Sequence, residues 1–465
     1  MKVLKRITKI WISVILLICV IVAGVGVYFA TMPPSPPPEV KKEVITISLW
    51  GYEDVSPWLD PVLEKFNKQT KDYVLKYNFK RVEWLDFPTA FSTAVAAGEK
   101  IDVILADPHW AGEWCKAGLL KDARELFPKE FFEQIVPGVL KGVEINNGGT
   151  GILPGIPFTL MTAGIWYNKK IFREAGISVP DWEADKYARA FTKDEFYEVC
   201  EKLKNAGVAP IGMLGETWTF QHIERIFLPM YTDDPTDFVI KTMKGEISFK
   251  NEEWLNIFRE ARRISQYFKE GYAGLDESAA ATGFAMGRTA MLFDGVWALR
   301  YIENVAPPDF ELGIMPYPYQ PPHSAWLCVG GAPAWMILKR TPSDTTQKIV
   351  DFIKFLYEDS NLLPTFDTHV RPGAGLPMKT TIMDKWVEEG YFKPVDVGKS
   401  LVAMVTKMPT MPWINEIEGV ELSDAICSEV AAVCQGTKTP EEAVEFLANK
   451  YIELKAENKI IIPVL

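Results

Sequence analysis

The sequence is poor in histidine, which is a common metal ligand in proteins. Its 465 residues include only four histidines, at positions 109, 222, 323 and 369, and these lie far apart in the chain. None of them shows the spacing of a metal-ligand motif. We therefore predict no metal site.

The six cysteines do not form the pattern of a disulfide framework. Cys19 falls within the apolar N-terminal segment. Cys427 and Cys434 lie on one expected helix with a rise of about 10.5 Å between them, which is too far for a bridge. For these two and for the remaining Cys115, Cys200 and Cys328 we expect buried thiols. A single bridge among them is the alternative.

The chain also lacks the motifs of several enzyme classes. It has no glycine-rich loop of the kind that cradles phosphates, and no Gly-x-Ser-x-Gly sequence for a nucleophilic serine. The 50 Lys and Arg are outnumbered by 61 Asp and Glu, and the body has no basic run that would match a nucleic acid backbone. We predict no cofactor, no nucleic-acid partner and no catalytic residues.

One long apolar run is present, at the N-terminus. Four basic residues precede the uncharged stretch Ile10 to Met32, which exceeds the roughly 20 residues that cross a bilayer. Basic residues on that side predict a cytoplasmic N-terminus and a body outside the cell. Residues 1–32 are therefore expected to be an uncleaved anchor in the cell membrane, and residues 33–43 a stiff proline-rich linker. A cleaved signal peptide is the alternative, as is lipidation at Cys19, although Ile18 precedes it where a small residue is wanted.

The body is longer than the roughly 250 to 300 residues at which single cores stop growing, so we expect two domains. Its first part alternates short β-branched runs with amphipathic helical patterns, which predicts an α/β fold with a parallel sheet. The strands expected there cover residues 44–50, 73–82 and 101–106, and the helices residues 59–66, 87–98 and 110–118.

Aromatic and acidic residues follow each of these three strands. Because ligands of open α/β sheets bind beyond the carboxyl ends of the strands, the three groups should converge on one rim. A second series of the same kind follows two later strands, one at residues 211–214 and one within Phe284 to Trp297 that ends before Asp294. An aromatic ring stacks on the C–H face of a sugar, and a carboxylate accepts hydrogen bonds from its hydroxyls, so the pattern favours a carbohydrate site. These residues are Trp50, Glu53, Trp84, Asp86, Asp107, Trp110, Trp218, Asp294 and Trp297.

The stretch Gly155 to Phe172 divides the two series. Its first part reads as an irregular crossing between lobes, in which Phe158 is expected to face the ligand. Ala163 to Tyr167 is expected to be a buried strand, and Asn168 to cap the short helix that Gly176 ends.

Several segments, in their order along the chain, resemble a known family. They are ITISLW, AVAAGEKIDVILAD with Trp110, AGLL, GIPFTLMTAGIWYNKKIF, FAMGRTAMLFDGVW, VGGAPAWMI, GLP, MPTMPW and GTKTPEEA. Across most of residues 44–455 the chain resembles the extracellular solute-binding proteins of ABC importers, of the maltose and oligosaccharide type.

The resemblance implies an α/β, two-lobe periplasmic-binding-protein-like fold behind an N-terminal transmembrane anchor. The first lobe would hold residues 44–158 plus 326–359, and the second residues 159–325 plus 360–465. Matched positions imply that Asp107 accepts hydroxyl hydrogen bonds, that Trp297 stacks on the sugar and that Gly331 offers backbone contact. The other residues implied at the site are Phe158 and Thr162 in the crossing, and Arg371 and Trp413 in the second lobe.

The expected function is that of a monomeric receptor on the extracellular face of the membrane. It would bind a small-molecule ligand, an oligosaccharide, between the lobes and deliver it to ABC permease subunits. Ala332 stands where such sugar binders often have an aromatic residue, which leaves the identity of the sugar open. The alternatives are a cell-surface glycoside hydrolase using Glu53 and Asp107, a binding protein for a peptide or polyamine, and an adhesive module.

Overall fold

The computed structural model describes residues 2–31, 42–179, 190–367, 375–413, 417, 419–460 and 462. The chain divides into two units, Met1–Val44 with Thr70–Val74, and Ile45–Gln69 with Leu75–Leu465.

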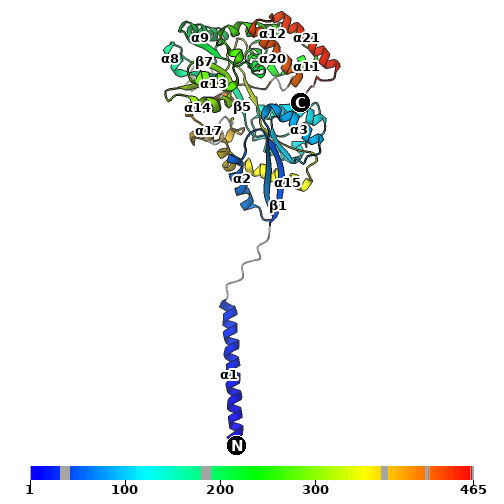
Figure 1. Ribbon diagram of the computed structural model, residues 1–465, viewed down its shortest axis with the longest axis vertical. Helices are drawn as coiled ribbons and strands as arrows, with labels where there is room; N and C mark the ends of the chain where they lie inside the picture. Colours follow the sequence, from blue (N-terminus) through cyan, green and yellow to red (C-terminus); the bar gives the residue numbers. More distant parts are fainter. Residues whose placement is uncertain are drawn as a thin grey trace. The chain divides into compact units, whose positions relative to one another are not determined.

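The first unit contains helix α1 (Lys2–Thr31), drawn in dark blue in Figure 1. Within it, Ile7–Val25 has a mean hydropathy of 2.5 and is long enough to cross a membrane. A signal sequence near an N-terminus has the same property, so the helix is compatible with an anchor and with a signal. The predicted linker, residues 33–43, lies mostly outside the described residues.

The second unit is built on two sheets, which confirms the predicted α/β class. The first sheet has the strand order β2-β1-β3-β10-β4, with β1 parallel to β3 and β10 antiparallel to both β3 and β4. The predicted parallel pairing is present, and β10 arrives from much later in the chain. These strands are β1 (Glu43–Gly51), β2 (Tyr73–Arg81), β3 (Val103–Ala106), β4 (Ile156–Pro157) and β10 (Ala334–Ile337).

The second sheet has the order β11-β9-β5-β7-β6, and β8 pairs with β5. Its central strands β5 and β7 are buried along their whole length, as expected for strands covered on both faces. The buried strand predicted within Ala163 to Tyr167 is therefore confirmed. The strands are β5 (Met161–Asn168), β6 (Ala209–Gly212), β7 (Thr289–Gly295), β8 (Leu312–Met315), β9 (Leu327–Gly330) and β11 (Thr410–Pro412).

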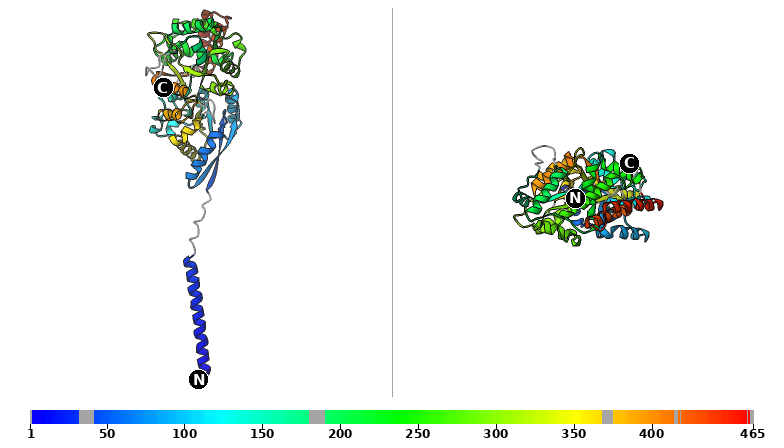
Figure 2. Two further views of the ribbon diagram at one scale, coloured as in Figure 1. Left: turned by 90° about the vertical axis from the view of Figure 1, so that its left-hand side faces the viewer. Right: turned by 90° about the horizontal axis from the view of Figure 1, so that it is seen from above.

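Helices surround both sheets. In Figure 1, α2, α3 and α15 lie around β1, whereas α9, α12, α20 and α21 lie on the part that carries β5 and β7, and the side view in Figure 2 keeps these two groups apart. Those of eight or more residues are α2 (Ser56–Gln69), α3 (Phe87–Ala96), α7 (Pro137–Glu144), α9 (Lys193–Asn205), α10 (Gln221–Tyr231), α11 (Pro235–Lys244), α12 (Glu252–Ile264), α13 (Glu277–Ala285), α15 (Ser343–Leu356), α17 (Thr380–Glu388), α18 (Val395–Lys407), α20 (Val420–Gln435) and α21 (Pro440–Ala456). The shorter ones are α4 (Ala111–Lys116), α5 (Ala123–Leu126), α6 (Lys129–Phe132), α8 (Lys169–Glu174), α14 (Leu299–Val305) and α16 (Asp359–Leu362).

Local capping signals in the sequence fix several helix ends. Thr192 and Glu195 form a capping box at the start of α9, and the side chain of Asn168 accepts from the backbone N–H of Ile171 at 3.1 Å. Gly436 closes α20 in the left-handed conformation, and α21 begins at Pro440. The cap at Asn168 agrees with the prediction because it depends on neighbouring residues alone.

Among the named strands, the chain passes between the sheets three times, from β4 to β5, from β9 to β10 and from β10 to β11. It leaves the first sheet after β4 and enters the second at β5, close to the predicted crossing. It returns between β9 and β10, and β9 (Leu327–Gly330) pairs with β5 and β11 in the second sheet. We therefore place this return at residues 331–333, later than the predicted position near residue 326. The lobe boundaries, adjusted in this way, remain a proposal.

The five cysteines of the body are all buried and free, so no bridge links them in the structure. These are Cys115, Cys200, Cys328, Cys427 and Cys434.

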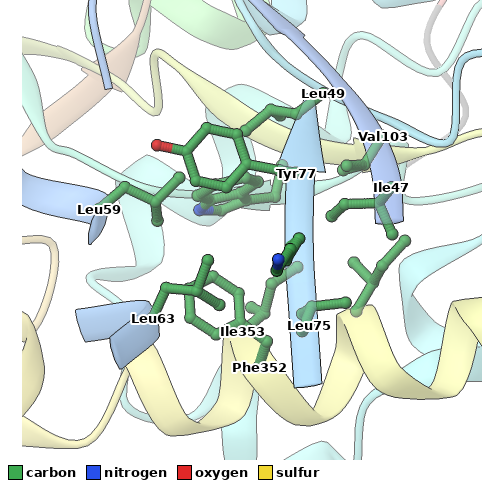
Figure 3. Close-up of a pocket in the computed structure, with 12 residues that line it drawn as sticks. Ile47, Leu49, Leu59, Leu63, Leu75, Tyr77, Val103, Phe352 and Ile353 are labelled. Atoms are coloured by element: carbon green, nitrogen blue, oxygen red, sulfur yellow. The ribbon is translucent and has the colours of Figure 1, made fainter. Parts of the chain in front are cut away.

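A small cavity lies inside the first sheet's core. Apolar side chains from β1, β2, β3, α2 and α15 converge around a volume of about 10 Å³, as Figure 3 shows for Leu49, Leu59 and Phe352. That volume corresponds to roughly one water molecule, and an apolar lining keeps such a space dry. It is a packing gap and too small for a sugar.

A buried ion pair holds α9 to α10 and α12. Glu260 accepts hydrogen bonds from Lys193 at 2.8 Å, Tyr231 at 2.8 Å and Tyr197 at 2.6 Å. Burial alone would raise the pKa of Glu260, but these three donors and the lysine charge lower it below its usual value of 4.5.

This pKa predicts how stability depends on pH. Because the folded pKa is depressed, Glu260 contributes stability above about pH 4.5 that is lost as the pH falls through the folded pKa. We expect the free energy of unfolding of the native chain to fall more steeply in this acid range than that of Glu260→Gln. Urea denaturation between pH 3 and pH 7 measures the difference, and parallel curves for the two proteins would contradict the assignment.

Candidate functional site

The first group of site residues lies at the carboxyl ends of β1, β2 and β3. It consists of Tyr52, Trp84, Asp107, His109 and Trp110, and is called the first cluster below. Trp84 follows β2, and its ring centroid lies 5.7 Å from that of His109 and 5.3 Å from that of Trp110. Trp110 is buried, and its ring centroid also lies 6.2 Å from that of Tyr52. Trp84, in contrast, is only half-buried. Trp84 therefore offers an aromatic surface to solvent.

Asp107 is the polar centre of the first cluster. Its carboxylate accepts from the backbone N–H of His109 at 3.2 Å, lies 2.9 Å from His109 Nδ1, and accepts from Trp84 Nε1 at 3.4 Å. Burial would raise the pKa of Asp107, but the charge and hydrogen bonds of His109 outweigh it and lower the pKa below its usual value. Asp107 is thus an ionised hydrogen-bond acceptor beside an open indole. It also caps the short 3-10 helix Pro108–Trp110 by accepting from the backbone N–H of His109.

The second group lies at the ends of β6, β7 and β11. It consists of Trp218, His222, Arg225, Trp297 and Trp413, and is called the second cluster. Trp297 stands at the centre, with ring centroids 6.3 Å from Trp218, 6.4 Å from His222 and 5.9 Å from Trp413. Trp218 and Trp297 are half-buried, and Trp413 is buried under the guanidinium of Arg225 at 4.1 Å. The cluster presents two partly open indoles on a packed base.

His222 is a polar group within this base. It is fully buried, and its Nδ1 lies 3.0 Å from the hydroxyl of Tyr317. Its Nε2 has no hydrogen-bond partner among the residues that the structure describes. Burial, with a smaller contribution from Arg225, lowers the pKa of His222 well below its usual range, so the ring is neutral at physiological pH.

Asp294 and Glu277 add two carboxyl groups next to Trp297. Asp294 is fully buried at the end of β7, and Glu277 lies 3.3 Å from the guanidinium of Arg300. Burial first, and the proximity of Glu277 second, raise the pKa of Asp294 well above its usual range. Burial likewise raises the pKa of Glu277.

Electrostatic interactions connect groups near the two clusters. The charge of Glu53, which follows β1, is one of the causes that raise the pKa of Arg300. The charge of His109 in the first cluster works to lower the pKa of Asp424 in α20. Charged groups that follow strands of the first sheet therefore lie near groups on helices that accompany the second sheet. A solute of modest size that touched both clusters would be enclosed between aromatic rings and carboxyl groups.

Other residues predicted at the site lie elsewhere. Trp50 is buried in β1, with the ammonium of Lys80 3.8 Å from its ring centroid, and Asp86 is exposed at the start of α3. Gly331 is buried, and a Cβ there would approach Pro157 to 2.7 Å, so its small size serves packing of the crossing. Arg371 lies outside the described residues.

The two crossing residues are corrections to the sequence prediction. Phe158 is 0% exposed and stacks on Trp58 at 4.7 Å and on Phe366 at 5.8 Å, so it faces the core and not the ligand. Thr162 is equally buried, because its hydroxyl donates to the carbonyl of Cys328 at 2.8 Å across the second sheet. Their position in the crossing gave no local signal of which way they point.

Several residues near the clusters were missed from the sequence. They are Tyr52, His222, Arg225, Glu277, Arg300 and Asp424. Tyr52 directly follows β1 and could have been included with its neighbours Trp50 and Glu53. The others lie on helices with ordinary amphipathic patterns, so nothing local separates them from surface or core residues. Among the described residues, no group of three His, Cys, Asp or Glu side chains is arranged to hold a metal ion.

The sequence is similar to those of several known proteins. The sequence model of the bacterial extracellular solute-binding protein family matches residues 51–361. The multiple sugar-binding protein of Streptococcus mutans is 24% identical over 308 residues, which cover 64% of this chain and 68% of that protein. The sn-glycerol-3-phosphate-binding periplasmic protein UgpB of Escherichia coli is 22% identical over 428 residues, covering 86% of this chain and 90% of UgpB.

Solved structures share the fold at low sequence identity. A chitin oligosaccharide binding protein superposes with a TM-score of 0.70 at 19% identity, covering 89% of this chain and 99% of its own. RafE from Streptococcus pneumoniae, in its apo form, superposes with a TM-score of 0.68 at 19% identity, covering 90% of this chain and 100% of its own. These likenesses establish a fold of the periplasmic-binding-protein type for the body.

Proposed function

Since the chain belongs to the family of bacterial extracellular solute-binding proteins, we propose that it is the substrate-binding receptor of an ABC importer and that its ligand is a sugar or oligosaccharide. The observation that carries the proposal is the pairing of half-buried indoles with carboxyl groups at the strand ends of both sheets. Trp84 lies beside Asp107 on one sheet, and Trp297 beside Asp294 on the other. Stacking surfaces combined with oriented acceptors suit pyranose rings and their hydroxyls.

The charge of the site favours a neutral ligand over a phosphorylated one. Asp107 and Glu53 contribute carboxylate groups, while Arg300 pairs with Glu277 and Arg225 covers Trp413. A ligand phosphate would meet the like charges of these two carboxylates, and juxtaposed like charges oppose binding. We therefore favour a sugar, as in the name of the S. mutans relative, over the glycerol phosphate in the name of UgpB.

Ligand capture would follow from movement of the two sheets about the crossing segments. Contacts from both clusters are available together only when the sheets approach, so a bound sugar would stabilise the closed arrangement by a shift of population. The permease would recognise that closed surface, and α1 would hold the body at the extracellular face of the membrane. The receptor would act as a monomer and without catalysis.

Calorimetric titration of the full chain in detergent tests this proposal. The panel contains raffinose, maltotriose, a chitin oligosaccharide, sn-glycerol 3-phosphate, a tripeptide and a linear polyamine. We expect heat of binding with at least one oligosaccharide and none with glycerol phosphate. Binding of the peptide or the polyamine in the absence of any sugar signal would overturn the carbohydrate assignment.

Turnover distinguishes the glycoside hydrolase alternative. The same protein, incubated with the oligosaccharide that binds, is expected to leave it intact. Hydrolysis that disappears in Asp107→Asn or Glu53→Gln would favour an enzyme.

A further inference from the structure

Two carboxyl groups near Trp297 each have one buried oxygen atom without a hydrogen-bond partner. Oδ2 of Asp294 and Oε1 of Glu277 have no hydrogen-bond partner within the described part of the chain. Asp294 is 0% exposed, and its other oxygen accepts from the backbone N–H of Gly295 at 2.7 Å. Buried polar atoms are nearly always paired in folded proteins, so two such atoms side by side at a ligand site indicate a donor that is absent from the free protein.

The surroundings of this pair are acidic. The charges of Glu216 and Asp276 both help to raise the pKa of Glu277. The charge of Glu53 helps to raise the pKa of Arg300, whose guanidinium pairs with Glu277. The positive charge of Arg300 is thus shared between the carboxyl groups of Glu277 and Glu53. Burial and repulsion by neighbouring carboxyl groups raise the pKa of both carboxyl groups of the pair, so their ionised forms are disfavoured in the free protein. A bound donor that also carries positive charge would restore the ionised forms, which a neutral hydroxyl would do less well.

Trp297 fixes where that donor would be. The indole of Trp297 favours the ionised form of Asp294, so the ring lies close to the acid. A pyranose stacked on the face of Trp297 would have its ring substituents close to Asp294 and Glu277. The donor is therefore expected on the sugar ring itself.

From this arrangement we infer that the second cluster selects a sugar with a free amino group, which is an ammonium at neutral pH, over the same sugar with a hydroxyl or an acetamido group at that position. The inference rests on the proposed function, since it names the class of sugar that the site takes. The ammonium would donate to Asp294 and Glu277 while the ring stacks on Trp297. An acetamido group has only one N–H and no charge.

A matched series of ligands tests the inference. Trimers of glucose, of glucosamine and of N-acetylglucosamine with the same β-1,4 linkage differ only in the group at C2, and each is titrated into the full chain by calorimetry. If the oligosaccharide panel identifies another linkage, the hydroxyl and amino forms of that sugar replace the trimers. We expect the amino form to bind at least about tenfold more tightly than the hydroxyl form, as for a close charge pair across an interface.

Variants distinguish a specific effect of Asp294 and Glu277 on amino-sugar affinity from an effect of the protein's overall negative charge. Asp294→Asn and Glu277→Gln are each expected to bring the affinity ratio of amino to hydroxyl sugar close to one. Glu311→Gln removes the same charge at an exposed position that pairs with Arg173 at 2.7 Å, and it is expected to leave the ratio as in the native chain. A linear polyamine is expected to bind weakly, because it has no ring to stack.

The outcomes distinguish this inference from the proposed function. Tight binding of a neutral sugar with an equal or weaker amino form would overturn the amino selectivity and leave the receptor function standing. A polyamine that binds as tightly as the amino sugar would also overturn it, since the ring would then be dispensable. Absence of binding by every sugar would overturn both.

Discussion

Phe158→Ala is expected to destabilise the folded chain by roughly 3 to 5 kcal/mol, the range for removing a fully buried phenylalanine. Its ring stacks on Trp58 and Phe366 and also contacts Trp335 at 6.0 Å and Tyr357 at 6.4 Å. Truncation would leave a cavity bounded by aromatic rings that have little freedom to collapse. Urea denaturation of the native and variant chains measures the loss.

A smaller truncation serves as the control for this residue. Phe158→Leu keeps most of the apolar volume and should cost markedly less than the alanine variant. For both variants, the affinity of the remaining folded protein for the sugar should stay within a few-fold of the native value. A stable Phe158→Ala protein that no longer binds sugar would return Phe158 to the ligand site, where the sequence had suggested it.

Trp297→Ala is expected to weaken sugar binding by about 1 to 3 kcal/mol, which corresponds to roughly 5- to 150-fold in the dissociation constant. Trp297 is half-buried at the centre of the second cluster, between Trp218 and Trp413. Its removal deletes the aromatic stacking surface beside Asp294. Calorimetry with the sugar identified in the panel gives the change directly.

The conservative variant separates stacking from packing. Trp297→Phe keeps an aromatic face and should recover much of the affinity, while the melting temperatures of both variants should stay close to that of the native chain. An alanine variant with native affinity and a clearly lowered melting temperature would make Trp297 a core residue.

Local sequence patterns were sufficient for much of the fold. The cap at Asn168 depends on residues within one turn, and its helix begins where predicted. The position of Trp84, Asp107 and Trp297 at strand ends was also predictable, because a parallel α/β arrangement brings such ends together.

Long-range packing decided what the sequence left open. Phe158 is buried by residues from distant segments, such as Trp58 and Phe366, that no local pattern links to it. The assignment of β9 to the second sheet depends on pairing with β5 and β11. The side chains of the two clusters are likewise brought together by contacts between segments that are distant in the sequence.

The proximity of Asp294 and Glu277 is another feature that the sequence alone does not reveal. Asp294 ends a strand, but Glu277 begins α13 and pairs with Arg300 of α14, so their proximity arises only in the folded chain. His222 has no local signal of its own, and it becomes notable only because its Nε2 is buried beside Trp218 and Trp297.

The central claim is that a sugar lies between the two clusters. A crystal structure of the chain with the sugar that binds most tightly in the panel tests it most directly. We predict a pyranose ring with its C–H face against Trp297 and a second part of the ligand in contact with Trp84 or Asp107. A sugar bound away from both clusters would contradict the account.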